Sequence, residues 1–178
     1  MMKSDLMTAQ LVLPSVEYKA SYLEALGEAV KEGRYHEIDA REIADDFAVH
    51  IENLLRRAVD EPVSGRVKET IFWLVDEGVY IGRLSIRHTL NRRLEMLGGH
   101  IGYEIRPSKR RQGYGTRILA LGLPEAWKLG LKRALVTCDS TNIGSRKIIE
   151  ANGGKLIDEN LLVGREVPVR RYWVRTHK

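Results

Sequence analysis

Residues 102–116, GYEIRPSKRRQGYGT, decide the fold. The residues from His100 to Ile105 predict a strand, and Pro107 ends it because proline lacks a backbone N–H. Residues 115–129 predict a helix that Gly130 closes. A loop that runs from a strand into a helix presents free N–H groups and the positive end of the helix dipole, which together favour binding of phosphate groups.

The loop itself has the composition of an anion-binding turn. Gly113 and Gly115 let a ligand approach the backbone with no β-carbon in the way, Arg110 and Arg111 add positive charge, and Thr116 adds a hydroxyl. Taken alone, the same pattern also describes a tight turn beside a solvated basic pair. The chain has no Gly-x-Gly-x-x-Gly after a first strand and no Gly-Lys-Ser/Thr, which argues against a dinucleotide-binding fold and a P-loop.

The elements predicted on either side complete an α/β pattern. Before the loop we expect a strand at 11–13, helices at 15–33 and 39–58, and an antiparallel meander of strands at 71–75, 79–87 and 100–105, with a loop at 88–97. After it we expect a helix kinked at Pro124, a strand at 133–138, a helix at 142–151, and strands at 156–162 and 167–176. The order predicts helices packed around one mixed sheet.

Composition limits the class of protein. The 178 residues, 43% hydrophobic and 30% charged, predict one domain over residues 1–178. No apolar run reaches the roughly 20 residues of a membrane helix, and no secretory signal is visible, so we expect a cytoplasmic protein. The single cysteine, Cys138, excludes an internal disulfide and a cysteine-based zinc site, and no metal is expected.

Charge favours an anionic ligand without naming it. The net charge of +5 suits a nucleic acid, a membrane surface or a phosphorylated ligand. The basic residues are spread along the chain, as on a solvated surface, and no basic strand or helix is interleaved with aromatic residues. We therefore expect neither a nucleic-acid partner nor a membrane partner.

At the glycine loop the chain resembles the GNAT superfamily of N-acetyltransferases. The signature Gln/Arg-x-x-Gly-x-Gly/Ala is matched by Arg110, Gly113 and Gly115, and a later Asn-x-x-Ser by Asn142 and Ser145. The element order agrees over residues 11–174. The resemblance implies a mixed, largely antiparallel central sheet of about seven strands with about four helices on its faces, and acetyl-CoA as the acetyl donor.

The same resemblance implies a cofactor site residue by residue. Arg110 adds charge near the pyrophosphate, Ile105 and Arg106 offer backbone groups to the pantetheine arm, Asn142 hydrogen-bonds that arm, and Ser145 lies near it. The amides around the pyrophosphate are those of Arg111, Gln112, Gly113, Tyr114, Gly115 and Thr116.

Catalysis needs a base for the amine and a donor for the developing oxyanion, which we expect from a backbone N–H near Ile105. His100 and Glu104 are both candidates for the base, because strand alternation places them on one face. The general acid departs from the family pattern: Ile149 stands where many members have a tyrosine. Ser145, Tyr103, Tyr172 or a water would then act, or the thiolate would leave unassisted.

These expectations give a leading function and two alternatives. The chain is expected to transfer acetyl directly to a primary amine of a small molecule or a peptide. The alternatives are an acetyl-CoA-binding regulator without turnover and a basic nucleic-acid-binding domain. The first two helices and the last hairpin are expected to form the acceptor pocket, where Glu24, Glu28 and Glu32 either attract a cationic amine or form a solvated face. Family members often pair through exposed strands, so a homodimer is compatible with the fold.

Overall fold

The computed structural model describes residues 6–35 and 39–177. The strands within this part are β1 (Gln10–Val12), β2 (Glu69–Asp76), β3 (Val79–Arg87), β4 (Ile101–Ile105), β5 (Arg133–Asp139), β6 (Lys155–Asn160) and β7 (Val169–Arg175). The α-helices are α1 (Lys19–Lys31), α2 (Ala40–Asp45), α3 (Phe47–Arg56), α4 (Arg92–Met96), α5 (Tyr114–Lys128) and α6 (Ile143–Ala151). The predicted α/β class is confirmed.

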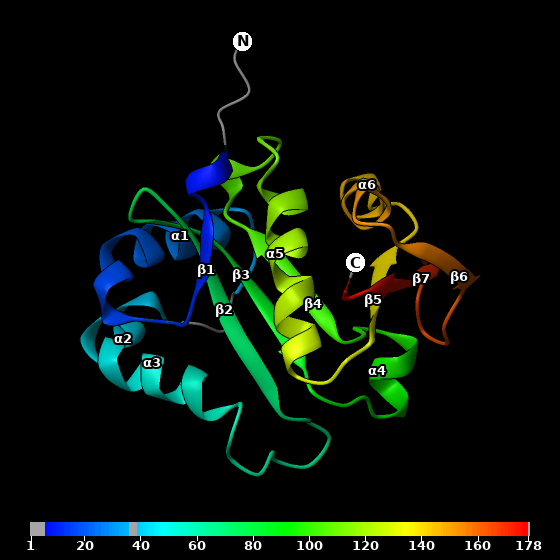
Figure 1. Cartoon of the computed structure of the whole chain (residues 1–178). Coiled ribbons are helices and arrows are strands. Elements are labelled where there is room, and N and C mark those ends of the chain that lie inside the picture. Colours follow the sequence, from blue (N-terminus) through cyan, green and yellow to red (C-terminus); the bar gives the residue numbers. More distant parts are fainter. Residues whose placement is uncertain (1–5, 36–38, 178) are drawn as a thin grey trace.

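The strands form two hydrogen-bonded groups where one continuous sheet was expected. The first has the order β1-β2-β3-β4 and the second the order β5-β7-β6, and every pair within them is antiparallel. Figure 1 shows the second group beside the first, with β5 next to β4. The two groups meet at the start of β4, where the N–H of His100 donates to the carbonyl of Leu135 over 2.7 Å. Beyond that contact, β4 and β5 are not paired.

Both faces of the first sheet are buried, which explains the apolar texture of β2 and β3. Ile71, Trp73 and Val75 pack with α1 and α3 on one face. Leu74 of β2 and Leu84 of β3 pack with α5 on the other. Alternate residues of a strand point to opposite faces, so a run with apolar residues at nearly every position serves two helical layers. Figure 1 shows α1, α2 and α3 on one side of this sheet and α5 on the other.

The helices differ in two places from the sequence prediction of about four. The helix expected at 39–58 is divided at Asp46, whose φ of −113° and ψ of 45° interrupt the helical backbone between α2 and α3. The loop expected at 88–97 contains α4, because the Asn91 side chain caps it by accepting the N–H of Leu94. Helix α5 continues through Pro124.

The start of β4 is held against β5 by a glycine. Gly99 has a φ of +61°, which side chains rarely tolerate. A β-carbon there would lie 2.3 Å from the carbonyl oxygen of Leu135. Only a residue without a side chain lets the two backbones come this close, so Gly99 sets the point from which the two sheets separate.

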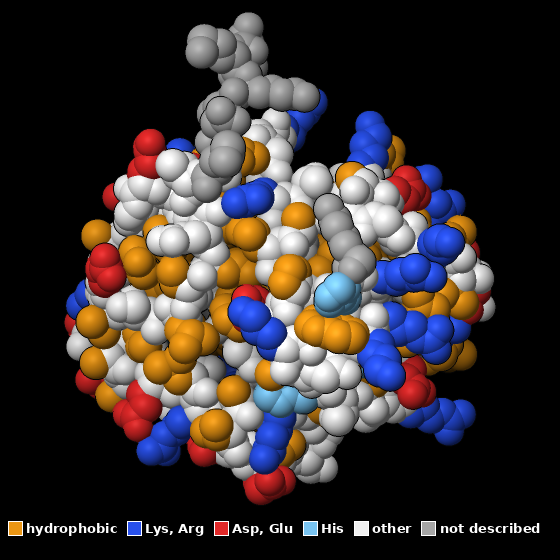
Figure 2. Space-filling view, viewed as in Figure 1, with side chains coloured by type: hydrophobic (Ala, Val, Ile, Leu, Met, Phe, Trp, Pro, Cys, Tyr) orange, Lys and Arg blue, Asp and Glu red, His pale blue; other side chains and the backbone are white. Residues whose placement is uncertain are grey.

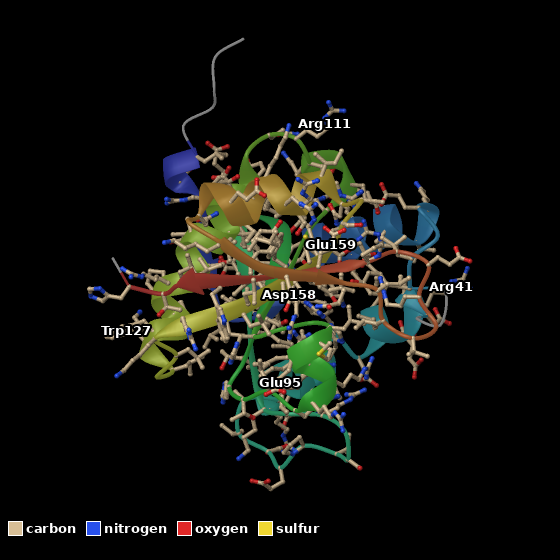
Figure 3. All side chains as sticks on the ribbon, turned by 90° about the vertical axis from the view of Figure 1, so that its right-hand side faces the viewer. Arg41, Glu95, Arg111, Trp127, Asp158 and Glu159 are labelled. Carbon is tan, nitrogen blue, oxygen red and sulfur yellow. The ribbon has the colours of Figure 1, made fainter. Side chains whose placement is uncertain are left out.

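Surface charge is distributed unevenly over the second sheet. Figure 2 shows Lys and Arg side chains gathered on the side of the molecule where β5, β6 and β7 lie. Lys132, Arg133 and Arg175 line a shallow depression there together with Trp127 and His177. Figure 3 shows Trp127 well away from Arg111 of the glycine loop. The depression beside Trp127 is therefore separate from that loop.

Candidate active site

A groove of about 540 Å³ runs between β4, the glycine loop and helices α5 and α6. It contains eight of the predicted cofactor-binding positions and the candidate base Glu104. Its lining residues are Arg34, Tyr103, Glu104, Ile105, Arg110, Arg111, Gly113, Gly115, Thr116, Asn142, Gly144, Ser145, Lys147 and Ile148. The separation of β4 from β5 thus coincides with the place where the sequence predicted a ligand.

The glycine loop directs free N–H groups at one end of the groove. Arg111 and Gly113 have φ of +60° and +94°, and α5 begins directly after Gly113. The N–H of Arg117 donates to the carbonyl of Gly113 over 3.1 Å. The N–H groups of residues 114–116 therefore precede the first intrahelical bond and have no partner within the helix. This is the backbone arrangement that holds a phosphate.

The side chains of the glycine loop make different contacts. The Nε of Arg110 donates to the carbonyl of Ile105 over 3.1 Å and its Nη1 pairs with Glu32 at 2.9 Å. Its Nη2 is buried and has no hydrogen-bond partner among the described residues, so it is free to donate to an anion in the groove. Gln112 donates to the carbonyl of Ser108 over 3.0 Å. Figure 3 shows Arg111 projecting outward at the top of the molecule.

Tyr114, in contrast, faces the core. It is buried, and its hydroxyl donates to Asp76 over 2.6 Å. Only its backbone N–H is then available to the groove. Gly115 allows close packing, because a β-carbon there would lie 2.4 Å from the Cδ1 of Ile148 on α6 and that side chain would have to shift. Gly115 therefore lets α6 close one wall of the groove.

Strand β4 offers backbone groups to the groove at every second residue. The N–H of Arg106 donates to the carbonyl of Ile81 in β3 over 2.9 Å. Partners in an antiparallel ladder alternate, so the N–H groups of Tyr103 and Ile105 point away from β3 and toward the gap. The expectation for Ile105 is consistent with this geometry. The expectation for Arg106 is corrected, because its N–H already belongs to the sheet.

The side chain of Arg106 ties β4 to α1. It is buried and forms an ion pair with Glu28, whose other oxygen accepts the N–H of Ser108 over 3.0 Å. Hydrogen bonds from Arg106 lower the pKa of Glu28 to about 2. Glu24 and Glu32 also pair with arginines, at 3.5 Å and 2.9 Å. These three glutamates of α1 and its C-terminal cap thus anchor the end of β4 and the glycine loop, and none of them lines the cavity on the other face of β4.

Glu28 should make the stability of the protein depend on pH in acid. Its folded-state pKa lies below its ordinary value, so its stabilising effect is complete above about pH 5 and is lost as the pH falls toward 2. We expect Glu28→Gln to lower the free energy of unfolding at pH 7 and to flatten its fall between pH 5 and pH 3, as measured by urea denaturation. Glu24→Gln is the control, because Glu24 is mostly exposed; an equally steep fall in Glu28→Gln would contradict the assignment.

A second cavity adjoins the groove on the opposite face of β4. It has a volume of about 140 Å³. Its lining residues are Tyr22, Ala25, Leu26, Ala29, Tyr35, Ile43, His50, Leu54, Arg57, Tyr80, Arg83, Glu104, Arg106 and Pro107. Helices α1 to α3 and strands β3 and β4 supply most of these residues. The expectation that the last hairpin contributes is corrected, since β6 and β7 belong to the other sheet.

Glu104 lines both cavities. One carboxylate oxygen accepts from Arg34 over 2.5 Å, and the other accepts from the hydroxyl of Tyr35. Both partners follow the end of α1, so the loop after that helix reaches the junction of the groove and the second cavity. A carboxylate at such a junction can take a proton from a group that is bound in one cavity and directed at the other cavity.

His100, the other candidate base, is packed between the two sheets. It is buried, its Nδ1 accepts the N–H of Leu135 over 2.9 Å, and its ring lies against Trp173. Burial and the nearby Arg87 lower the pKa of the imidazole. His100 lines neither cavity, so the structure does not support its predicted role as the base; its Nδ1 instead accepts a bond that joins the start of β4 to β5.

Two hydroxyl groups meet in the groove. The Oη of Tyr103 lies 2.7 Å from the Oγ of Ser145. Burial raises the pKa of Tyr103 to about 12, with the nearby Ser145 acting in the opposite direction. Tyr172, a third candidate acid, is buried in the core away from the groove. Ile149 is also fully buried, so that position contributes packing.

Asn142 organises the start of α6. Its Oδ1 accepts the N–H of Ser145 over 2.9 Å, which caps the helix. This bond fixes the turn that carries Ser145 into the groove. The predicted hydrogen bond from Asn142 to pantetheine would have to come from its amide nitrogen, since the carbonyl oxygen already serves the helix.

Sequence reasoning missed the lining of the second cavity. No motif in the sequence marks Tyr22, Tyr35, His50, Tyr80 or Arg83. One signal was available for Arg83: it lies opposite Glu104 in the pairing of β3 with β4. To use this signal one must know the register of the two strands, and the register could not be predicted because the length of the loop between them was uncertain.

Comparison with known families agrees with the geometry. The family model described as acetyltransferase (GNAT) domain matches residues 33–155, about two thirds of the chain. The chain belongs to the GNAT acetyltransferase family. As a GNAT protein it is an acyltransferase, and the family uses acetyl-CoA. No curated protein matches the chain.

Solved structures share the GNAT fold at low sequence identity. The acetyltransferase from Salmonella typhimurium that modifies the N-terminal serine of ribosomal protein L7/L12 is 15% identical, with a TM-score of 0.64 over 95% of each chain. The microcin C7 self-immunity acetyltransferase MccE, solved with acetyl-CoA and AMP, is 16% identical, with a TM-score of 0.67 over 95% of this chain and 93% of that one. RimJ from Mycobacterium smegmatis, solved with a coenzyme A disulfide, is 17% identical, with a TM-score of 0.67 over 94% and 81%.

Two further properties bear on the chemistry of this GNAT protein. Within residues 6–35 and 39–177, no three His, Cys, Asp or Glu side chains form a cluster suited to a metal ion. None of the helices described is both long and apolar enough to cross a membrane.

Proposed function

We propose that this protein is an acetyl-CoA-dependent N-acetyltransferase that transfers acetyl directly to a primary amine of a small molecule or a peptide. One observation carries the proposal: Glu104 lines both the groove and the second cavity. A donor in the groove and an amine in the second cavity would meet at this carboxylate. Positioning two reactants at such a junction supplies much of the rate acceleration in group transfer.

The residues of the groove fit the donor. Free N–H groups of residues 114–116 and the unpartnered Nη2 of Arg110 suit a pyrophosphate, and the unpaired edge of β4 suits an extended amide chain. When bound, acetyl-CoA supplies an acetyl group already activated as a thioester. The N–H groups of Tyr103 and Ile105 face the gap, where they can donate to a carbonyl oxygen.

Glu104 would act on the amine. An ammonium ion has no lone pair, so the acceptor must lose a proton before it reacts. Glu104 accepts that proton directly or through a water, and Arg34 and Tyr35 hold the carboxylate in place. His100 has no part in this step. The peptide or small molecule would bind in the second cavity, between α1, α3 and strands β3 and β4.

The Tyr103–Ser145 pair is positioned to return a proton to the departing thiolate. Its members are 2.7 Å apart in the groove, so either hydroxyl can support the other. We expect Tyr103→Phe to lower kcat about 10- to 100-fold and Ser145→Ala by a smaller factor, with unchanged affinity for coenzyme A in calorimetry. Tyr172→Phe is the control. If Tyr103→Phe kept full activity with every amine, the thiolate would leave without help from this pair.

Isotope transfer tests the proposed function. Labelled acetyl-CoA would be incubated with the protein and a panel containing peptide N-termini, polyamines, amino acids and simple amines, while thiol release is followed in parallel. Labelled, acid-stable product from at least one amine is expected. Coenzyme A binding with no transfer to any class would support the regulator without turnover, and absence of both binding and transfer would overturn the proposal.

A further inference from the structure

The second cavity contains more positive than negative charge. Three arginines and one glutamate line it. Arg106 is neutralised by Glu28, and Arg57 pairs with Glu69 at 2.9 Å. The single carboxylate, Glu104, is already bonded to Arg34. Arg83 forms no ion pair within the part of the chain that the structure describes, so the cavity retains one uncompensated guanidinium.

Arg83 lies directly beside the candidate base. The two residues are directly opposite each other in the pairing of β3 with β4, so their side chains point to the same face of the sheet. The Cα atoms of such a pair lie about 5.5 Å apart. Yet they form no ion pair, and each is available to a different group of the same ligand. An amine at Glu104 would therefore have Arg83 within a few ångströms.

The tyrosines of the cavity report where the charge of Arg83 acts. Burial raises the pKa of Tyr22 and Tyr80, and it raises that of Tyr35 to about 12. In each case the charge of Arg83 opposes the rise. The hydroxyl groups of these tyrosines come from α1, the loop after it and β3, and they line the same cavity as Arg83.

The remaining wall is apolar and short. Ala25, Leu26, Ala29, Ile43 and Leu54 supply hydrocarbon surface opposite the charged strand residues. The volume of about 140 Å³ suits a ligand with a few carbon atoms beyond its polar groups. A long polycation would meet the uncompensated guanidinium of Arg83, which repels it, and a carboxylate that is already bonded to Arg34.

We infer that the acceptor is a small amine carrying a carboxylate one or two carbons from its nitrogen, with a short apolar side chain, and that Arg83 binds the carboxylate. This inference rests on the proposed function and names its substrate class. A guanidinium pairs with a carboxylate through two parallel hydrogen bonds, so Arg83 would also orient the amine toward Glu104. Arg83 is thereby a specificity-determining residue.

The substrate comparison removes only the carboxylate. Leucine and 3-methylbutylamine have the same apolar group and amine, and leucine amide keeps the size but not the charge. We expect kcat/KM to be about 10- to 100-fold higher for leucine than for either analogue, the range for a hydrogen bond to a charged group. Equal values for leucine and 3-methylbutylamine, or a polyamine as the best acceptor, would overturn the inference.

The matched variants test Arg83 itself. We expect Arg83→Gln to lower kcat/KM for leucine about 10- to 100-fold more than it lowers that for 3-methylbutylamine. Arg41→Gln is the control, because Arg41 is exposed on α2 and Figure 3 shows it at the outer edge of the molecule. An equal loss for both substrates in Arg83→Gln would mean that the residue supports folding and not carboxylate recognition.

Direct binding separates this inference from the proposed function. Leucine binding is measured by calorimetry without any acetyl donor, for the wild type and for Arg83→Gln. If leucine binds and Arg83→Gln weakens that binding at least 10-fold, the inference is supported, whether or not an amine is acetylated. If no amine is acetylated, the proposed function is refuted. Acetylation of other amines with no leucine binding would refute the inference and leave the proposed function standing.

Discussion

Replacing Glu104 with glutamine is expected to lower kcat by about 10²- to 10⁴-fold, the range for loss of a general base. Glutamine keeps the size of the side chain, and its carbonyl oxygen can still accept from Arg34 or Tyr35. The groove loses no backbone donor, so affinity for coenzyme A should stay within a factor of about two. Steady-state kinetics at saturating donor, with calorimetry for coenzyme A, checks both expectations.

Glu95→Gln is the matched control for this loss. Glu95 is exposed on α4, and Figure 3 shows it far from Arg111 and the glycine loop. We expect it to retain wild-type kcat. Full activity in Glu104→Gln would show that the amine loses its proton to water or to solution before it enters the cavity. Such a result would not make His100 the base, because His100 lines neither cavity.

Replacing Gly99 with alanine should destabilise the protein by about 3 kcal/mol, from backbone strain and overpacking together. The φ of +61° penalises any side chain, and the new β-carbon would lie 2.3 Å from the carbonyl oxygen of Leu135. Relief of that contact requires β4 to move from β5 at the point where the groove begins. Urea denaturation would show a lower midpoint, and coenzyme A affinity should fall with it.

Gly78→Ala separates the two contributions to this effect. Gly78 has a φ of +76° in the turn between β2 and β3, and a β-carbon there would meet nothing within 4 Å. It should cost about 1 kcal/mol, the conformational part alone. If Gly99→Ala were no more destabilising than Gly78→Ala, the close approach of β4 to Leu135 would not be essential to the fold.

The glycine loop could be predicted from the sequence because its chemistry is local. Arg110, Gly113 and Gly115 lie within six residues, and the strand before and helix after them follow from short-range patterns. The choice between His100 and Glu104 could not be made in this way, since alternation gives them the same face. It depended on Leu135, which bonds to His100 from 35 positions along the chain.

The lining of the second cavity could not be predicted from the sequence for the same reason. Glu28 looked like one member of a solvated acidic row, and its partner Arg106 lies 78 positions away. The pairing of Arg83 with Glu104 depends on the register of β3 with β4. Helix and strand periods report which face a residue uses, but they do not report what lies opposite that face.

The short strand between Gly99 and Arg106 also constrains how this protein can change its length. One added residue after His100 would reverse the phase of β4, sending the carboxylate of Glu104 toward α5 and the ring of Tyr103 toward α1. The other walls of both cavities would stay in place, but each cavity would lose the functional side chain that β4 supplies to it. A deletion would do the same. Insertions that preserve activity should therefore be confined to the connecting loops, such as 161–168, and variants of this segment should differ in residue type but not in residue number.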